Sequence, residues 1–203
     1  YKNKITALPD GDYTTTIYGA NVLTSVGRAA GVFYGYETDG VYATQQEAEE
    51  AGLTLVSTTG EVTPFAAGDM KFVDHVQDGI INEKDMVVIG NPNPDVYGNL
   101  YSNLSYKRLS LNMNFNYSFG NDIYNYQRSQ LESGSQFFNQ TTALNRRWIA
   151  EGHHTDIPKA TFGDPMGNSR FSDRWIEDGS YLRLRSVTLS YELPVNSVWL
   201  QGL

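Results

Sequence analysis

The sequence predicts an all-β fold with long amphipathic strands. Residues 109–119 alternate apolar and polar side chains without a break, as Leu-Ser-Leu-Asn-Met-Asn-Phe-Asn-Tyr-Ser-Phe. Because successive side chains of a strand point to opposite faces, this segment has one apolar and one polar face. A second alternating run covers residues 97–106, and a third strand is expected over residues 181–193. No run of eighteen apolar residues occurs, which excludes a membrane-spanning helix.

The strand at residues 109–119 has the length of a bilayer crossing. Its polar face carries Ser and Asn but no charge, whereas a half-exposed strand of a soluble sandwich usually has Lys, Glu or Thr there. At about 3.3 Å per residue and a tilt near 40°, it rises roughly 27 Å, close to the apolar band of about 25 Å in an outer-membrane barrel. From this segment alone, a barrel strand and an ordinary amphipathic strand both remain open.

Composition narrows the class of protein. The net charge of −8 and the pI of about 4.8 argue against a nucleic-acid partner, which would need a basic surface. Cysteine is absent, so disulfides and thiolate metal sites are excluded. The 14 tyrosines suit either aromatic girdles or sugar stacking. The chain begins without methionine and stops just after the apolar cluster Val198–Leu200, so we expect a segment of a longer protein.

The first third of the chain is expected to hold short strands and one helix. A strand is predicted over Asp12–Val22, interrupted at Gly19. The Gly- and aromatic-rich segment Gly27–Tyr42 predicts extended backbone with close approaches between chains. Thr44 is an expected N-cap for a short acidic helix that runs to Ala51 and stops at Gly52.

Four oxygen-bearing side chains follow the spacing of a calcium loop. They are Asp74, Asp78, Asn82 and Asp85, which fall on ligand positions one, five, nine and twelve, with a turn-forming glycine at position six. Val76 occupies position three, where Asp or Asn is usual, and Asp85 replaces the bidentate Glu of position twelve. Two interpretations follow: a degenerate Ca²⁺ site, and a metal-free turn that keeps the shape of the loop.

The second half of the chain is organised around the long strands. Asn91–Asp95, read Asn-Pro-Asn-Pro-Asp, is a polar connector that cannot lie inside a sheet. Lys107-Arg108 is the expected tip of a tight hairpin. Gln130–Asp178 has no sustained period and predicts a long, ordered loop.

The last strand is expected to contain a bulge. Its apolar face changes parity between Leu184 and Val187, as a β-bulge requires. Arg183 and Arg185 then share one face, which suits a polar lumen.

Six blocks of sequence form an ordered set. They are residues 33–40 (Phe-Tyr-Gly-Tyr-Glu-Thr-Asp-Gly), 68–72 (Gly-Asp-Met-Lys-Phe), 89–95 (Ile-Gly-Asn-Pro-Asn-Pro-Asp), 120–125 (Gly-Asn-Asp-Ile-Tyr-Asn), 146–148 (Arg-Arg-Trp) and 172–184 (Ser-Asp-Arg-Trp-Ile-Glu-Asp-Gly-Ser-Tyr-Leu-Arg-Leu). In this order and approximate spacing, the chain resembles the SusC/RagA-type TonB-dependent transporters of Bacteroidetes outer membranes, over nearly its whole length.

The resemblance implies a segment of a large (about 22-stranded) transmembrane antiparallel β-barrel, with long extracellular loops and short periplasmic turns. Residues 1–203 would be part of the barrel domain near its C-terminus. The N-terminal plug domain, the TonB box and the final strands have no match in this chain. Such proteins lie in outer-membrane lipid, import glycans or peptides with a SusD-type surface lipoprotein, and are driven by TonB.

Signatures of an enzyme are missing from the sequence, so no catalytic residue is assigned. There is no G-x-S-x-G, no H-E-x-x-H and no phosphate loop. His153 and His154 are neighbours, would point apart on a strand, and are interpreted as loop residues. Glu177 and Asp178 are too close in sequence to straddle a glycosidic bond, and we expect them to pair with Arg174.

The main alternative to a transporter is a soluble, secreted β protein that binds carbohydrate through surface aromatics and the calcium-like turn. A hydrolase would need a pair of carboxylates in a cleft, and the sequence gives no such pair.

Overall fold

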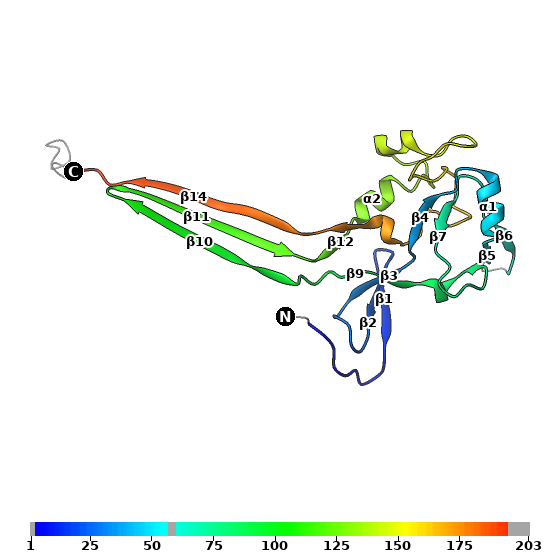
Figure 1. Ribbon diagram of the computed structural model, residues 1–203, viewed down its shortest axis with the longest axis horizontal. Helices are drawn as coiled ribbons and strands as arrows, with labels where there is room; N and C mark the ends of the chain where they lie inside the picture. The colour runs from blue at the N-terminus through cyan, green and yellow to red at the C-terminus, as the bar shows by residue number, and fades with distance from the viewer. Residues whose placement is uncertain (1–2, 57–59, 195–203) are drawn as a thin grey trace.

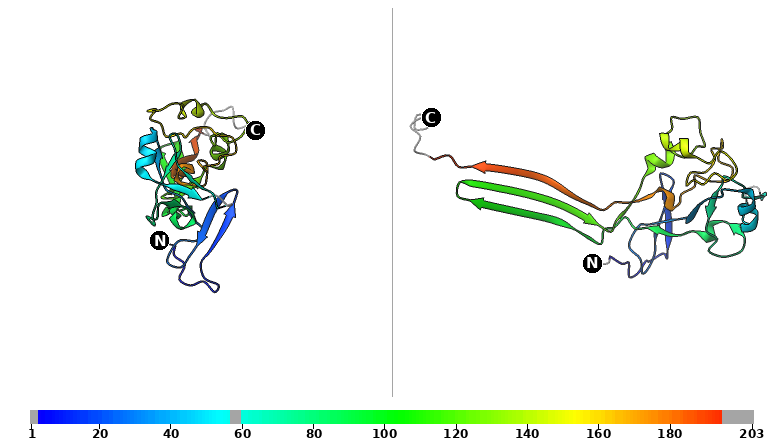
Figure 2. Two further views of the ribbon diagram at one scale, coloured as in Figure 1. Left: turned by 90° about the vertical axis from the view of Figure 1, so that its right-hand side faces the viewer. Right: turned by 45° about the horizontal axis from the view of Figure 1, so that its top comes forward.

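The structure is a computed structural model that describes residues 3–56 and 60–194, so the apolar cluster at residues 198–200 lies outside the described residues. A long three-stranded sheet projects as an arm from a compact region of short strands (Figure 1). The same arrangement is visible from two further sides in Figure 2. Among the described residues, no helix is long and apolar enough to cross a membrane.

The arm consists of three antiparallel strands of eleven residues each, in the order β10, β11, β14. The strands are β10 (Val96–Tyr106), β11 (Leu109–Phe119) and β14 (Tyr181–Tyr191). Lys107 and Arg108 form the tip of the β10–β11 hairpin, and Lys107 has a positive φ of 54°. The hairpin and the last strand are therefore confirmed.

The bulge predicted in the last strand is present. Ser186 lies opposite Asn114 and Leu184 lies opposite Phe115, so Arg185 has no partner on β11. This extra residue keeps leucine and valine on one face of β14 although their parity in the sequence changes. Arg183 lies opposite Asn116, on the polar side of the register.

A four-stranded sheet lies where the arm meets the compact region. Its order is β1 (Tyr13–Ile17), β2 (Ala20–Thr24), β3 (Val32–Gly35) and β9 (Val87–Gly90). The strand predicted over Asp12–Val22 is instead a hairpin. Tyr18 (φ 48°) and Gly19 (φ 81°) both have positive φ, the backbone of a tight two-residue turn that reverses the chain.

The compact region is built from small sheets and one helix. Its elements are β4 (Thr38–Val41), α1 (Gln45–Ala51), β5 (Thr54–Val56), β6 (Val62–Pro64), β7 (Met70–Phe72) and β8 (Ile80–Ile81). The predicted caps of α1 are confirmed, because the Thr44 side chain accepts from Glu47 N–H and Gly52 is left-handed. One buried cluster comprises Val41, Tyr42, Ala48, Phe65, Met70, Phe72, Ile81 and Met166, and a second comprises Ala20, Phe33 and Phe171.

The long segment between β11 and β14 is ordered, as expected, but not without regular structure. β12 (Asp122–Tyr124) pairs with β13 (Ile176–Asp178), and a short helix, α2 (Tyr126–Leu131), was not predicted. Three 3₁₀ turns complete the described elements: η1 (Glu83–Asp85), η2 (Thr142–Arg146) and η3 (Asp173–Trp175).

Candidate functional site

The arm has one face that is apolar across all three strands. In the register, Leu104, Leu111 and Leu189 lie side by side, and Leu100, Phe115 and Leu184 form another such row. Most of these side chains are exposed; Leu189 is 65% exposed. An apolar surface of this extent needs an apolar partner, since soluble monomers rarely leave one open.

The opposite face is polar and follows the same rows. Asn112 is at its centre, where its Oδ1 accepts from Tyr101 Oη at 2.9 Å and from Asn103 Nδ2 at 2.5 Å. Across the sheet the rows are Tyr97-Ser118-Tyr181, Asn99-Asn116-Arg183, Tyr101-Asn114-Ser186, Asn103-Asn112-Thr188 and Ser105-Ser110-Ser190.

Two amides of this polar face are incompletely satisfied. The Oδ1 atoms of Asn114 and Asn116 are buried and have no hydrogen-bond partner among the described residues. Arg183 stacks on Tyr181, with its guanidinium carbon 5.3 Å from the ring centroid. The face therefore retains unused acceptors close to an aromatic side chain.

The arm is fastened to the compact region where β11 ends. Gly120 has a φ of 78°, and its N–H donates to Ser180 Oγ at 3.0 Å. A Cβ at this position would come within 2.7 Å of Asp95 Oδ2, and Asp95 N–H already donates to the Phe119 carbonyl. Only glycine fits this left-handed, crowded position.

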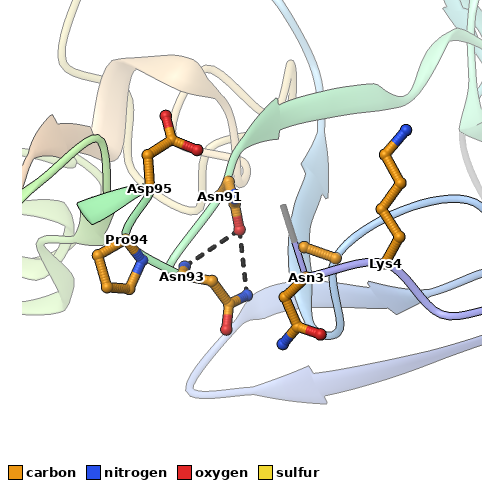
Figure 3. A pocket seen from close by; sticks show the side chains of 7 residues that line it. Asn3, Lys4, Asn91, Asn93, Pro94 and Asp95 are labelled. Atoms are coloured by element: carbon orange, nitrogen blue, oxygen red, sulfur yellow. Dashed lines mark hydrogen bonds between the residues drawn. The ribbon is translucent and has the colours of Figure 1, made fainter. Parts of the chain in front are cut away.

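A small polar pocket lies beside this junction (Figure 3). It has a volume of about 240 Å³ and takes most of its lining from the connector predicted at residues 91–95. Asn91 Oδ1 accepts from the backbone N–H and the Nδ2 of Asn93, both at 3.1 Å. Asn93 Nδ2 also donates to the Ala30 carbonyl at 2.7 Å. The connector lies outside the sheets, as predicted.

The calcium-like loop folds as a turn whose carboxylates bind backbone amides. Asp74 accepts from Gln77 N–H at 2.6 Å and from Gly79 N–H at 2.8 Å. Asp85 is fully buried and accepts from Val76 N–H at 3.2 Å and Asn82 N–H at 2.9 Å.

The other two predicted ligands are engaged in the same way. Asp78 accepts from Ile80 N–H at 3.0 Å, and the Asn82 side chain accepts from Lys84 N–H at 2.9 Å. Desolvation acts to raise the pKa of Asp74, but the amides it accepts from outweigh it and lower that pKa. Within the described residues, no group of three or more His, Asp or Glu side chains is placed to hold a metal ion. Calcium binding by Asp74, Asp78, Asn82 and Asp85 stays a prediction.

The acidic pair near the last strand has other partners than expected. Glu177 pairs with Arg128 at 3.1 Å and accepts from Asn125 Nδ2, while Asp178 accepts from Ser180 N–H at 2.8 Å. Arg174 is stacked on Trp175 at 4.3 Å instead of pairing with the acids. Burial lowers the pKa of Arg174 to about 10. The expected pairing with Arg174 is therefore wrong, because its neighbour Trp175 is fully buried and holds Arg174 over its ring.

His153 and His154 lie in irregular backbone, as interpreted from the sequence. The backbone N–H of His153 donates to the Ala150 carbonyl at 3.0 Å, and this hydrogen bond closes a turn.

Sequence blocks far apart in the chain meet in the compact region. Thr38 donates to Asp173 through both its N–H and its hydroxyl, the latter at 2.6 Å. Tyr36 pairs with Ser172 in an isolated bridge. At Gly35 a Cβ would lie 2.8 Å from the Phe171 carbonyl oxygen. The first and last blocks are thus parts of one contact, which the sequence alone did not reveal.

A buried carboxylate joins the block at residues 68–72 to the segment that carries Lys159 and Asn168. Asp69 accepts from Ala66 N–H and Asn168 Nδ2, both at 2.9 Å, and pairs with Lys159 at 3.1 Å. Trp148 covers the neighbouring Gly68, where a Cβ would approach the indole within 2.5 Å. Periodicity does not reveal these contacts, because they join segments that are far apart in the sequence.

The comparisons with known proteins agree with this architecture. No family model matches the chain. The chain is 31% identical to TonB-dependent receptor P26 of Formosa agariphila, over 100% of the chain and 20% of that protein. It is 33% identical to TonB-dependent receptor P3 of the same organism, with the same coverage. The chain belongs to the TonB-dependent receptors. It spans about a fifth of the length of these curated relatives.

Solved structures show the same fold. In the RagAB peptide importer in the closed-closed state, the similarity covers 95% of this chain and 20% of that chain, with a TM-score of 0.63 and 22% identity. The open-open state gives a TM-score of 0.59. The SusC/RagA-type resemblance and the fold class, a segment of a transmembrane antiparallel β-barrel, are confirmed. The sheet of β10, β11 and β14 is the part of the barrel wall that the described residues contain.

Proposed function

We propose that the chain forms a wall segment and two extracellular loops of a TonB-dependent importer of nutrient oligomers, glycans or peptides, in the outer membrane. The arm carries the proposal. It has three eleven-residue strands with an exposed apolar face and a polar face, which is the pattern of a barrel wall between lipid and lumen.

The orientation follows from the lengths of the connections. The β10–β11 turn at Lys107-Arg108 is short, as periplasmic turns are, and the connections at the other end of the arm are long. Residues 3–95 and 120–180 then lie outside the cell. We place the chain in the barrel domain, and the plug, the TonB box and the final strands in the rest of the longer protein.

The extracellular region also offers a surface for a SusD-type lipoprotein. Phe137 and Phe162 stack with ring centroids 4.8 Å apart, yet Phe137 is 89% exposed. Phe138 is exposed beside them. An apolar cluster of this kind on a loop surface suits a protein partner. TonB would contact the N-terminal part of the longer protein, and the relatives' names, receptor and importer, favour transport over catalysis.

The experiment is an aspartate scan in the full-length parent protein. Leu111→Asp, Met113→Asp and Phe115→Asp place a charge on the lipid face, at a cost of up to about 2 kcal/mol near the midplane. We expect these variants to fail to assemble, measured by heat-modifiable migration of outer-membrane fractions on a gel.

Asn112→Asp and Asn114→Asp are the matched controls, since they lie on the same strand but on the lumen face. They are expected to assemble like the wild type. If both sets behave alike and the protein stays soluble without detergent, the transporter is wrong and the secreted carbohydrate-binding protein takes its place.

A further inference from the structure

We infer that the polar face of the arm holds a slot for one sugar ring of a neutral glycan, between Tyr97 and Tyr181. The inference rests on the proposed function, because it places the slot on the lumen side of a barrel wall. A cavity of about 570 Å³ opens at the end of the arm nearest the compact region. Both tyrosines line it, with Ser118 between them and with Asn99 and Asn116 in the next row.

The register sets the width of the slot. Tyr97 lies opposite Ser118 on β11, and Ser118 lies opposite Tyr181 on β14. The two tyrosines are thus two strand spacings apart, about 10 Å between their backbones. Carbon atoms in contact are about 3.5 to 4 Å apart, so one saturated six-membered ring fits between two side chains at this spacing. Tyr97 is 76% exposed and Tyr181 is 43% exposed, and Arg183 stacks on one side of the Tyr181 ring.

The floor of the slot offers an unused acceptor. Asn116 Oδ1 is buried and has no partner in the described part of the chain. Buried polar atoms are normally hydrogen-bonded, so this carboxamide oxygen is placed to receive a donor from a ligand. A glycan hydroxyl is such a donor. Ser118 is already committed, because its Oγ donates to Asn121 Oδ1 at 2.8 Å.

Charge distinguishes a glycan from a peptide here. Every side chain that lines the slot is uncharged. Arg183, in the next row, is stacked against Tyr181. No carboxylate of the lining is available for the ammonium or guanidinium groups of a peptide, and desolvating such groups without a partner is costly. A neutral sugar combines apolar C–H faces for the tyrosines with hydroxyl edges for the amides.

The test uses the full-length receptor, purified in detergent with its lipoprotein. The probes are printed arrays of neutral glycans, acidic glycans and short peptides. We expect the wild type to bind neutral glycans. Tyr97→Ala and Tyr181→Ala should each weaken that binding about tenfold, and Tyr97→Phe should retain it because the ring remains.

Tyr101→Ala is the matched control, because Tyr101 points to the same face of β10 but does not line the slot. Equal binding by the Tyr101, Tyr97 and Tyr181 variants overturns the slot, as does a wild type that binds only peptides, only acidic glycans, or no probe. Heat-modifiable migration of each preparation separates the two proposals. A wild type that assembles but binds no neutral glycan overturns the slot alone, whereas one that fails to assemble overturns the proposed function as well.

Discussion

The arm and the compact region achieve order in different ways. In the compact region, Trp175 is fully buried and Met70 and Ile81 are each 1% exposed, so apolar side chains find partners within the chain. Along the arm, most residues of β10 and β14 are exposed on both faces. Within the described sheet β11 is paired on both sides, whereas β10 and β14 are edge strands. The outer edges of the arm and its exposed side chains therefore need neighbouring strands, lipid or lumen to cover them. One chain thus contains a part with its own core and a part completed by its surroundings.

The two regions also respond differently to polar groups. On the arm, Asn and Ser line the polar face, and where their polar atoms are exposed water or a ligand can replace a lost partner. In the compact region, Asp69 is 1% exposed and holds residues 66–70 to the segment that contains Lys159 and Asn168. Substitutions in the compact region test whether its polar groups are less replaceable than those of the arm.

The largest effect is expected from Asp69→Ala. Removal of the carboxylate leaves Ala66 N–H and Asn168 Nδ2 without that acceptor, and leaves Lys159 with the Ala67 carbonyl in place of its ion pair. Breaking a buried ion pair costs about 3 to 5 kcal/mol, and Lys159 is partly exposed and can rehydrate, so we expect about 2 to 3 kcal/mol. Hydrogen exchange on the full-length receptor in detergent should show faster exchange across the compact region and unchanged exchange in β10, β11 and β14.

Lys71→Ala is its control, because the Lys71–Glu47 pair joins the same region at the surface. Both side chains of this pair are partly exposed, and a solvent-accessible ion pair contributes about 0 to 1 kcal/mol, so exchange should change little. If the two variants lose equal protection, or if the arm loosens together with the compact region, the contrast between the regions fails.

A smaller effect is expected from Gly35→Ala. Gly35 has no unusual φ, but an added Cβ would lie 2.8 Å from the Phe171 carbonyl and 2.9 Å from Ile89 Cδ1. Overpacking of this kind costs about 1 to 3 kcal/mol and should separate the first block of sequence from the last. Limited proteolysis should then cut the 120–180 segment more quickly than in the wild type. Unchanged digestion would show that the two blocks are not held together through this contact.

The arm could be predicted from the sequence because its determinants are local. Alternation with period two predicts the strands, and the change of parity predicts a bulge between Leu184 and Val187, which the structure places at Arg185. The residues of the polar face, including Tyr97 and Asn116, were therefore predictable as a set. Their assembly into a slot required the register of three strands, one of which follows sixty residues later in the chain.

The compact region could be predicted only in part, because its contacts are between segments distant in sequence. The caps of α1 are local and were predicted, whereas the Asp12–Val22 hairpin was not, since Tyr18 gives no warning of a positive φ. The sequence also did not predict the pairing of Glu177 with Arg128. Arg128 lies in α2, a helix that has no clear hydrophobic period and that was not predicted. Where a side chain has several possible partners, the tertiary packing decides which one it contacts, and the spacing of residues in the sequence does not reveal that choice.

The smallest effect is expected when Ca²⁺ is added or removed, measured as hydrogen exchange in the loop at residues 74–85. Asp74 and Asp85 are already satisfied by four backbone amides of residues 76–82, so a bound ion would have to displace those bonds. We therefore expect the full-length receptor to show the same hydrogen exchange over residues 74–85 in millimolar Ca²⁺ and in EGTA. Asp85→Asn should increase exchange there under both conditions, because the buried acceptor is weakened whether or not an ion is present. Protection of the loop by Ca²⁺ in the wild type, abolished in Asp85→Asn, would instead establish the degenerate calcium site and make this loop, like the arm, a part that its surroundings complete.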